Sequence, residues 1–407
     1  MRRVVVTGIG AVSPLGAAWQ QVEARMRTLQ NAVQVMGEWA QYDGLNTQLG
    51  VPVPDFEVPA HWTRKQTRSM GRVSKLAVCS TERAIADAGL TDAEVLRSGR
   101  TGVAFGSSAG SPDAITEFGD MRMNLSTAGL NATSYVRMMG HTTAVNIGVF
   151  FGLTGRVIPT SSACTSGSQG IGYAYEAIRA GYQDVMMSGG AEELCATEAA
   201  VFDTLYATST RNSTPALTPR PFDAARDGLV IGEGSCTLVL EEREHALQRG
   251  AKIYCEIVGF ATNSDGVHVT RPNRDTMQRC ISMSLDAAGI APGQIGYISA
   301  HGTATPWGDI AESHATCAVL GDTPISAMKS YVGHTLGACG ALEAWWAIEM
   351  MRNGWYAPTL NLENIDPECA ELDYIVGEGR NMSNEFVMSN NFAFGGINTS
   401  LIFKLVD

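Results

Sequence analysis

Short runs of β-branched and other apolar residues alternate along the chain with longer stretches whose apolar positions repeat every three to four residues. Helical periodicity is clearest over residues 72–88 and 169–180, and a glycine, the residue type that most often ends a helix, follows each stretch. Strands that alternate with helices predict an α/β protein. The predicted strands lie at residues 4–6, 102–105, 185–187, 237–240, 295–300 and 401–405.

One pattern of strand, turn and small-residue helix occurs twice. A strand predicted at residues 156–159 leads to Cys164 and a glycine-rich helix, and a strand predicted at residues 324–327 leads to His334 and a second such helix. Chance is one explanation, because α/β units resemble one another. The alternative is a duplicated fold in which each half supplies part of the chemistry.

A duplicated fold predicts a boundary near residue 250. Residues 1–250 then form an N-terminal half that carries the cysteine, and residues 251–407 form a C-terminal half that carries two histidines and a lysine. A chain of 407 residues is long enough for one large core or for two smaller cores fused together.

Composition and charge exclude several classes of protein. Apolar residues make up 45% of the chain and charged residues 17%, as in compact proteins. The formal net charge is 29 − 41 = −12, which disfavours nucleic-acid binding. The nine cysteines form no CxxC pair, so we expect neither a disulfide framework nor a metal site. The longest apolar stretch, residues 144–153, is far shorter than the ~20 residues of a membrane span, and we expect a cytoplasmic protein.

Cys164 differs from the other cysteines by its position in Ser-Ser-Ala-Cys-Thr-Ser-Gly, residues 161–167, between a predicted strand and a predicted helix. The start of a helix presents unpaired N–H groups and the positive end of the helix dipole. This position favours the thiolate and provides an anion site beside the sulfur. A packed core thiol is the alternative interpretation.

Two histidines stand in loops whose composition gives them no obvious packing role. His301 lies in Ala-His-Gly-Thr-Ala-Thr-Pro, and His334 lies in Lys329-Ser-Tyr-Val-Gly-His-Thr. A cysteine nucleophile with two hydrogen-bond donors suits acyl transfer. Lys329 lies in an apolar stretch and requires an anionic partner if it is buried, for which Glu312 is a candidate. A solvated surface lysine is the alternative.

A second possible nucleophile belongs to another class of enzyme. Ser108 is the serine of Gly-Ser-Ser-Ala-Gly, residues 106–110, which matches the GxSxG pattern of serine hydrolases. Pro112 follows where the helix of that motif begins, a position at which proline is tolerated. Near the C-terminus, Phe394 precedes two glycines that would let a loop move or approach a ligand closely. An ordinary turn is the alternative for that segment.

Taken together and in this order, the segments around Cys164, His301, Lys329, His334 and Phe394 resemble those of the β-ketoacyl-[acyl carrier protein] synthases, condensing enzymes of the thiolase-like superfamily. The resemblance extends from the first strand to the last and is strongest to the type I and II elongating enzymes. It implies a thiolase-like, five-layered αβαβα fold of two similar halves, in a homodimer or a heterodimer with a paralogue.

The resemblance also implies a decarboxylative Claisen condensation, in which Cys164 takes an acyl group from the phosphopantetheine of an acyl carrier protein and no further cofactor is needed. His301 and His334 would then hydrogen-bond the malonyl thioester. Backbone N–H groups of Cys164 and Phe394 would form the oxyanion hole, and Phe394 would gate the acyl pocket. The remaining implied roles are the ordering of the histidines by Lys329 and Glu312 and the lining of the pantetheine channel by Thr303 and Thr305. A partner subunit without catalytic activity is the non-enzymatic alternative.

Two further features concern the partner and the substrate. Positive charges at Arg64, Lys65, Arg68 and Arg72 would share one face of a helix, and the resemblance places docking of the acidic carrier protein there. Substrate choice is the second feature. Ala393 stands where relatives usually have glycine, Trp307 where they have a smaller residue, and the small Ala109 lies in the loop that borders their acyl pocket. We therefore expect a specialised elongating enzyme, for a polyene or polyketide-like chain.

Overall fold

A computed structural model describes residues 1–91 and 94–406, and in it two sets of five strands form one continuous ten-stranded sheet. The first set runs in the order β5-β4-β6-β8-β1 and the second in the order β11-β10-β14-β15-β9. The two sets meet where Val4–Val6 of β1 pair antiparallel with Cys255–Ile257 of β9. The strands are β1 (Val4–Val12), β4 (Thr101–Gly106), β5 (Val157–Pro159), β6 (Val185–Glu192), β8 (Gly234–Glu242), β9 (Cys255–Ser264), β10 (Ile295–Ser299), β11 (Ile325–Ser326), β14 (Phe386–Ala393) and β15 (Ile397–Lys404).

The two sets have the same topology. In each, the first strand of the set in sequence lies at the seam, the second and third pair in parallel, and the last two pair antiparallel. The predicted duplication into two similar halves is therefore confirmed. Two small sheets complete the strands: β2 (Gln34–Val35) with β3 (Leu49–Val51) and β7 (Ile231–Gly232), and β12 (Trp355–Tyr356) with β13 (Arg380–Asn381).

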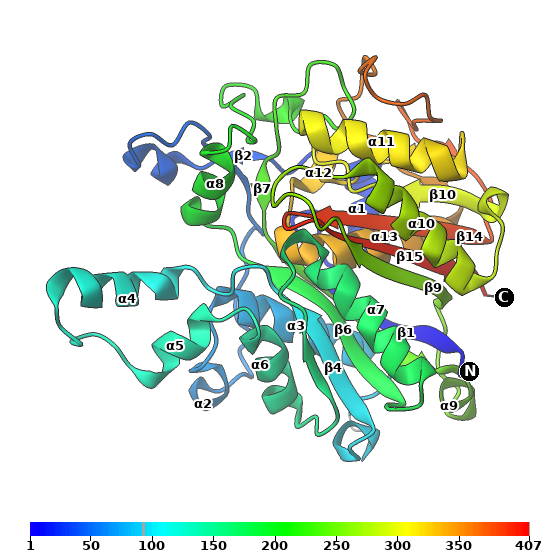
Figure 1. The fold of residues 1–407 in the computed structure, drawn as a ribbon. Helices are drawn as coiled ribbons and strands as arrows, with labels where there is room; N and C mark the ends of the chain where they lie inside the picture. Colours follow the sequence, from blue (N-terminus) through cyan, green and yellow to red (C-terminus); the bar gives the residue numbers. More distant parts are fainter. Residues whose placement is uncertain (92–93, 407) are drawn as a thin grey trace.

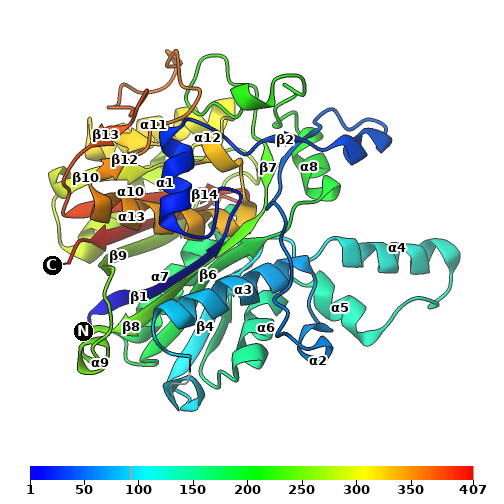
Figure 2. The same ribbon diagram turned by 180° about the vertical axis from the view of Figure 1, so that it is seen from behind.

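Helices form three layers around the strands (Figures 1 and 2). Between the halves lie α7 (Ser166–Arg179) and α13 (Cys339–Asn353), which touch each other and strands of both halves. Every residue of α13 from Cys339 to Met351 is buried, as expected of a helix surrounded by protein. The outer layers contain α3 (Arg72–Asp87) and α6 (Thr142–Phe151) on the first half and α10 (Arg274–Ala288) and α11 (Pro306–Leu320) on the second.

The remaining helices connect or extend these layers: α1 (Trp19–Arg27), α2 (Arg64–Thr67), α4 (Asp113–Asn124), α5 (Ala132–Met138), α8 (Ala196–Asp203), α9 (Arg243–Gln248) and α12 (Lys329–Val332). Figure 1 shows α4 and α5 projecting from the body of the protein. None of the helices in the described ranges has the length and apolar character needed to cross a membrane. All nine cysteines are free thiols.

Glycines permit the close packing of α3 on the first strand. A Cβ atom at Gly8 would lie 2.4 Å from the carbonyl oxygen of Ala84, and one at Gly10 would lie 2.1 Å from that of Ser80. These distances are far below van der Waals contact, so only glycine fits at the two positions. The predicted helix ends are also observed, because Gly89 and Gly181 adopt the left-handed conformation (φ 68° and 82°) directly after α3 and α7.

Candidate active site

Cys164 lies in a single 3-10 turn, Ala163–Thr165, between β5 and the start of α7. Ala163 has a φ of +51°, a left-handed conformation that costs an alanine about 1–2 kcal/mol. This sharp turn directs the chain from the strand into the central helix. Cys164 is 4% exposed, and its side chain lies in an apolar cluster with Phe202 and Leu336.

The equivalent turn of the second half brings His334 to the sulfur. His334 precedes a 3-10 turn, Leu336–Ala338, that leads into α13. A Cβ atom at Gly167, in the first turn of α7, would lie 2.9 Å from the carbonyl oxygen of Gly337, so glycine allows the two helix starts to approach closely. His334 Nε2 is 3.0 Å from Cys164 Sγ.

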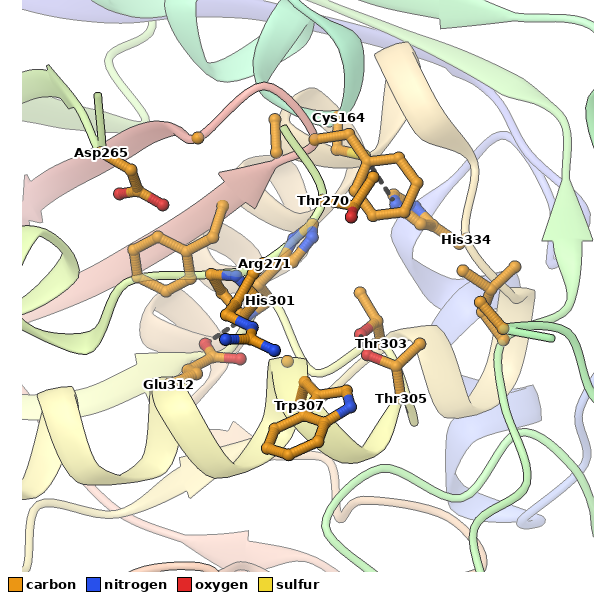
Figure 3. Close-up of a pocket in the computed structure, with 18 of the residues that line it drawn as sticks. Cys164, Asp265, Thr270, Arg271, His301, Thr303, Thr305, Trp307, Glu312 and His334 are labelled. Atoms are coloured by element: carbon orange, nitrogen blue, oxygen red, sulfur yellow. Dashed lines mark hydrogen bonds between the residues drawn. The ribbon is translucent and has the colours of Figure 1, made fainter. Parts of the chain in front are cut away.

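His301 completes the group from the end of β10. A nitrogen of His301, a nitrogen of His334 and the sulfur of Cys164 all lie within 4.8 Å of one another. The two imidazole rings are nearly perpendicular, with centroids 5.2 Å apart. Figure 3 shows the three side chains converging on one pocket. The predicted juxtaposition of one cysteine and two histidines from opposite halves is therefore present in the structure.

Hydrogen bonds define which nitrogen of each ring carries a proton. Lys329 Nζ donates to Nδ1 of His301 at 3.1 Å, and the backbone N–H of Leu336 donates to Nδ1 of His334 at 3.2 Å. A ring nitrogen that accepts a hydrogen bond has no proton, so each neutral ring carries its proton on Nε2. Burial and the charge of Lys329 hold the pKa of both rings well below the ordinary value. The site therefore presents two neutral N–H donors.

Burial controls the charge of the nucleophile. It raises the pKa of the Cys164 thiol to about 11, and the charge of Lys329 and the N–H groups of Phe394 and Cys164 itself only partly offset this effect. Burial therefore opposes the effect that the sequence analysis expected from the helix start. The sulfur is a thiol at rest, although donors already face it.

The Lys329 ammonium is neutralised by a residue that the sequence analysis did not select. Its Nζ lies 2.5 Å from Glu343 Oε1, on α13, and both side chains are at most 2% exposed. The expected ion pair with Glu312 is therefore wrong. Glu312 instead accepts hydrogen bonds from the backbone N–H groups of His301 and Gly302, both at 2.7 Å, and holds the loop after β10.

A pocket opens from Cys164 and the two histidines to the surface. Thr303 and Thr305 line it and share a hydrogen bond of 2.8 Å between their hydroxyl groups. The Phe394 ring also lines the pocket and stacks on Phe202, with centroids 5.1 Å apart. Trp307, which is 71% exposed, also lines this pocket (Figure 3).

Comparison with known families decides the assignment. The model described as "Beta-ketoacyl synthase, N-terminal domain" matches residues 1–246, and the model described as "Beta-ketoacyl synthase, C-terminal domain" matches residues 254–363. The chain belongs to the β-ketoacyl synthase family. Its fold is accordingly thiolase-like, as the resemblance implied.

Individual relatives match this β-ketoacyl synthase along its whole length. The 3-oxoacyl-[acyl-carrier-protein] synthase 1 of Haemophilus influenzae is 38% identical over 412 residues, which cover 99% of each chain. A crystal structure of a β-ketoacyl synthase from Burkholderia phymatum has a TM-score of 0.99 and 59% identity over 100% of both chains. The structure titled "The ishigamide ketosynthase/chain length factor" has a TM-score of 0.91 and 30% identity, again over 100% of both chains.

The GxSxG segment of this β-ketoacyl synthase has a structural role. Ser108 donates from both its backbone N–H (2.7 Å) and its hydroxyl (2.5 Å) to Glu192 Oε2. Ser107 and Gly337 donate to the same buried carboxylate. Within the described residues no histidine bonds to Ser108, so this serine lacks the base that a hydrolase requires. The serine hydrolase alternative is therefore wrong.

The predicted docking segment differs from expectation. The basic segment is not one helix, because α2 ends at Thr67 and α3 starts at Arg72. Arg64, Lys65 and Arg68 are exposed, whereas Arg72 forms an ion pair with Glu233 at 2.6 Å and contributes little free charge. Ala109 does not line the pocket described above, and its backbone N–H lies 3.4 Å from Glu192 Oε1. Its place beside the acyl chain stays a prediction.

The cysteine and the two histidines of the site do not suit a metal ion. Cys164, His301 and His334 could bring one ligand atom each within 4.8 Å of the others. A metal would need unprotonated nitrogens, whereas Nε2 of each ring carries a proton and the ammonium of Lys329 lies beside His301. The expected absence of a metal stays a prediction that this arrangement supports.

Sequence reasoning missed two residues of the site. Glu343 lies 14 residues after Lys329, and no local pattern indicates that the two meet, because only the packing of α13 against the loop brings them together. Phe202 lies on α8 in the first half, far in sequence from Phe394. Neither segment alone contains a pattern that predicts the stacking of these two rings, which come from different halves.

Proposed function

We propose that this chain is a β-ketoacyl-[acyl carrier protein] synthase that joins an acyl group held on Cys164 to a malonyl group held on a carrier protein, with loss of CO2. The observation that carries the proposal is the buried sulfur facing two neutral Nε2–H donors in a pocket that reaches the surface. The full-length relatives named 3-oxoacyl-[acyl-carrier-protein] synthase support it.

The first half-reaction is transfer of the acyl group to Cys164. The sulfur attacks the thioester carbonyl, the carrier thiol leaves with the proton of the Cys164 thiol, and an acyl-cysteine remains. Negative charge on the carbonyl oxygen is stabilised by the N–H groups of Cys164 and Phe394, both of which face the sulfur in the resting site. Phe394 moves off Phe202 to admit the chain.

The second half-reaction makes the new carbon–carbon bond. The malonyl thioester oxygen accepts hydrogen bonds from Nε2–H of His301 and His334, CO2 leaves, and the resulting enolate attacks the acyl-cysteine carbonyl. The Cys164 sulfur departs and takes up one proton from solvent. Neutral donors in a buried site stabilise the enolate without a metal or a charged acid.

The roles of the supporting residues follow from their contacts. Lys329, which is neutralised by Glu343, donates a hydrogen bond to Nδ1 of His301. This bond keeps the proton of the His301 ring on Nε2. Thr303 and Thr305 lie along the wall of the pocket, where a pantetheine arm would pass. Substrates arrive on that arm, and no other cofactor is required by the chemistry.

The class of acyl substrate, the oligomeric assembly and the domain boundary also belong to this proposal. Ala393 and Trp307 line the pocket and support a specialised acyl chain, of fatty-acid or polyketide-like character. A dimer, with a second copy or a paralogue, is supported by the ketosynthase/chain length factor relative. The division at about residue 250 is supported by the repeated strand order and by the loop between α9 and β9.

The decisive experiment combines the purified chain with an acyl carrier protein and a malonyl carrier protein. We expect the malonyl carrier to be converted to a species with the mass of the corresponding 3-oxoacyl carrier, with release of one CO2 for each product. Intact-mass spectrometry and a 14C-CO2 trap measure the two products. The proposal would be contradicted if the protein became acylated but formed no condensation product with acyl groups of several different lengths.

Charge reversal on the exposed basic surface tests carrier docking. Replacing Lys65 and Arg68 together with glutamate is expected to raise KM for the carrier about tenfold and to weaken its salt dependence, because rim charges steer an acidic partner. The rate with an acyl-pantetheine lacking the carrier should stay unchanged. Reversing two other exposed arginines, Arg97 and Arg279, is the matched control. Equal KM values for the two double variants would exclude docking at this surface.

A further inference from the structure

Two donors converge on one nitrogen of the active site. Lys329 Nζ lies 3.1 Å from Nδ1 of His301, and Nδ2 of Asn391 lies 3.3 Å from the same atom. Each of these donors also bonds one oxygen of Glu343: Lys329 Nζ to Oε1 at 2.5 Å and Asn391 Nδ2 to Oε2 at 2.7 Å. The carboxylate therefore holds both donors against the imidazole ring.

Strand pairing explains why Asn391 reaches His301. Ser389 on β14 pairs in parallel with Ser299 on β10. Asn391 and His301 each lie two residues beyond these partners, so they are neighbours at the same end of the sheet. Each of the four residues in this hydrogen-bonded group is at most 5% exposed, so water does not compete for their hydrogen bonds. The four are His301, Lys329, Glu343 and Asn391.

The orientation of the Asn391 amide follows from Glu343. With the amide reversed, its oxygen would face a carboxylate oxygen at 2.7 Å, and two acceptors would repel each other in a buried site. The NH2 group therefore points to Glu343 and to Nδ1 of His301. This leaves the amide oxygen without a partner among the described residues.

We propose that Asn391 is a positioning residue which, together with Lys329, keeps Nδ1 of His301 unprotonated so that the proton stays on Nε2, facing the substrate. The proposal rests on the proposed function for its catalytic consequence. Among the described residues Asn391 has no hydrogen bond to Cys164 and does not line the pocket, so it would act on the reaction through His301. A ring with its proton on Nδ1 would present a lone pair to the malonyl oxygen and could not stabilise the enolate.

Replacing Asn391 with aspartate keeps its size, and it exchanges the NH2 donor for a carboxyl group whose ability to donate depends on pH. Besides His301, the titratable groups that face this position are Lys329, Glu343 and the Cys339 thiol. Two further titratable groups contact His301 itself: Glu312 accepts from its backbone N–H, and the His334 ring packs against its ring. Burial and Glu343 favour the neutral form of the introduced carboxyl, which can still donate one hydrogen bond. When this carboxyl loses its proton at higher pH, the resulting carboxylate attracts a proton to Nδ1 instead.

The activity test is decarboxylation of malonyl carrier protein as a function of pH. We expect the Asn391→Asp variant to act within about fivefold of the parent at pH ~6 and about 100-fold more slowly at pH ~9, because the donor to Nδ1 is lost as pH rises. Asn391→Leu should be about tenfold slower at every pH, with no new titration. The control is Asn390→Asp, which buries a carboxyl on the same strand with its side chain on the opposite face.

A direct readout of the proton makes the test independent of turnover. In 15N-histidine-labelled protein, we expect Nδ1 of His301 to be unprotonated in the parent and in Asn390→Asp, and protonated in Asn391→Asp at the higher pH. An unprotonated Nδ1 in Asn391→Asp at that pH, with a parental pH profile, overturns the proposal. Absence of decarboxylation by the parent would refute the proposed function instead, and the NMR result would still decide the role of Asn391.

Discussion

Replacing Cys164 with alanine is expected to abolish the acyl adduct and to reduce condensation by about 10⁴-fold or more, because removal of a covalent nucleophile leaves only binding and the oxyanion donors. The Cys164 sulfur contacts His334 Nε2 and lines the pocket, whereas the neighbouring Cys339 thiol, which bonds the backbone oxygen of Cys164, does not line it. Intact-mass analysis after incubation with an acyl carrier protein measures the adduct, and product formation measures the condensation.

Ser108→Ala is the matched control for this experiment. The hydroxyl of Ser108 bonds to Glu192 and not to a histidine, so its loss should change condensation by less than about threefold and lower stability by about 1 kcal/mol. An acyl adduct that persists in Cys164→Ala, or one that disappears in Ser108→Ala, would place the nucleophile elsewhere. Digestion and peptide mapping of the adduct identify the modified residue.

Removing either histidine is expected to slow decarboxylation of the malonyl thioester about 10²–10³-fold, the usual effect of losing one donor to a developing oxyanion. The two variants should differ in acylation. His334 Nε2 contacts Cys164 Sγ at 3.0 Å, so His334→Ala should also slow formation of the acyl-enzyme. His301 has its hydrogen-bond partners in Lys329 and Asn391, so His301→Ala should leave acylation within about threefold of the parent.

Stopped-flow release of CO2 and single-turnover acylation separate the two steps. His314→Ala is the control, because this histidine lies away from the pocket and bonds the backbone oxygen of Glu368. Equal acylation rates in His301→Ala and His334→Ala would contradict the separate roles assigned to the rings. Decarboxylation at the parental rate in both variants would exclude enolate stabilisation by the histidines.

Local patterns along the chain were sufficient for the architecture and for the three central side chains. The alternation of short apolar runs with amphipathic stretches and terminating glycines depends on neighbours within a few residues, which is why α3 and α7 were predicted within a few residues of their observed ends. The repeated strand, turn and helix likewise predicted two similar halves. Because each half places its reactive residue directly before its central helix, Cys164 and His334 had to meet where those helices meet.

Contacts between distant segments and the degree of burial were decided by the tertiary structure alone. The partner of Lys329 is Glu343 and not Glu312, because α13 passes beside the lysine while Glu312 is occupied by backbone N–H groups. Burial also raises the pKa of the Cys164 thiol to about 11 although the residue lies at a helix start, because a charge removed from water is disfavoured. Such effects depend on everything that surrounds a group, and that environment exists only after the chain has folded.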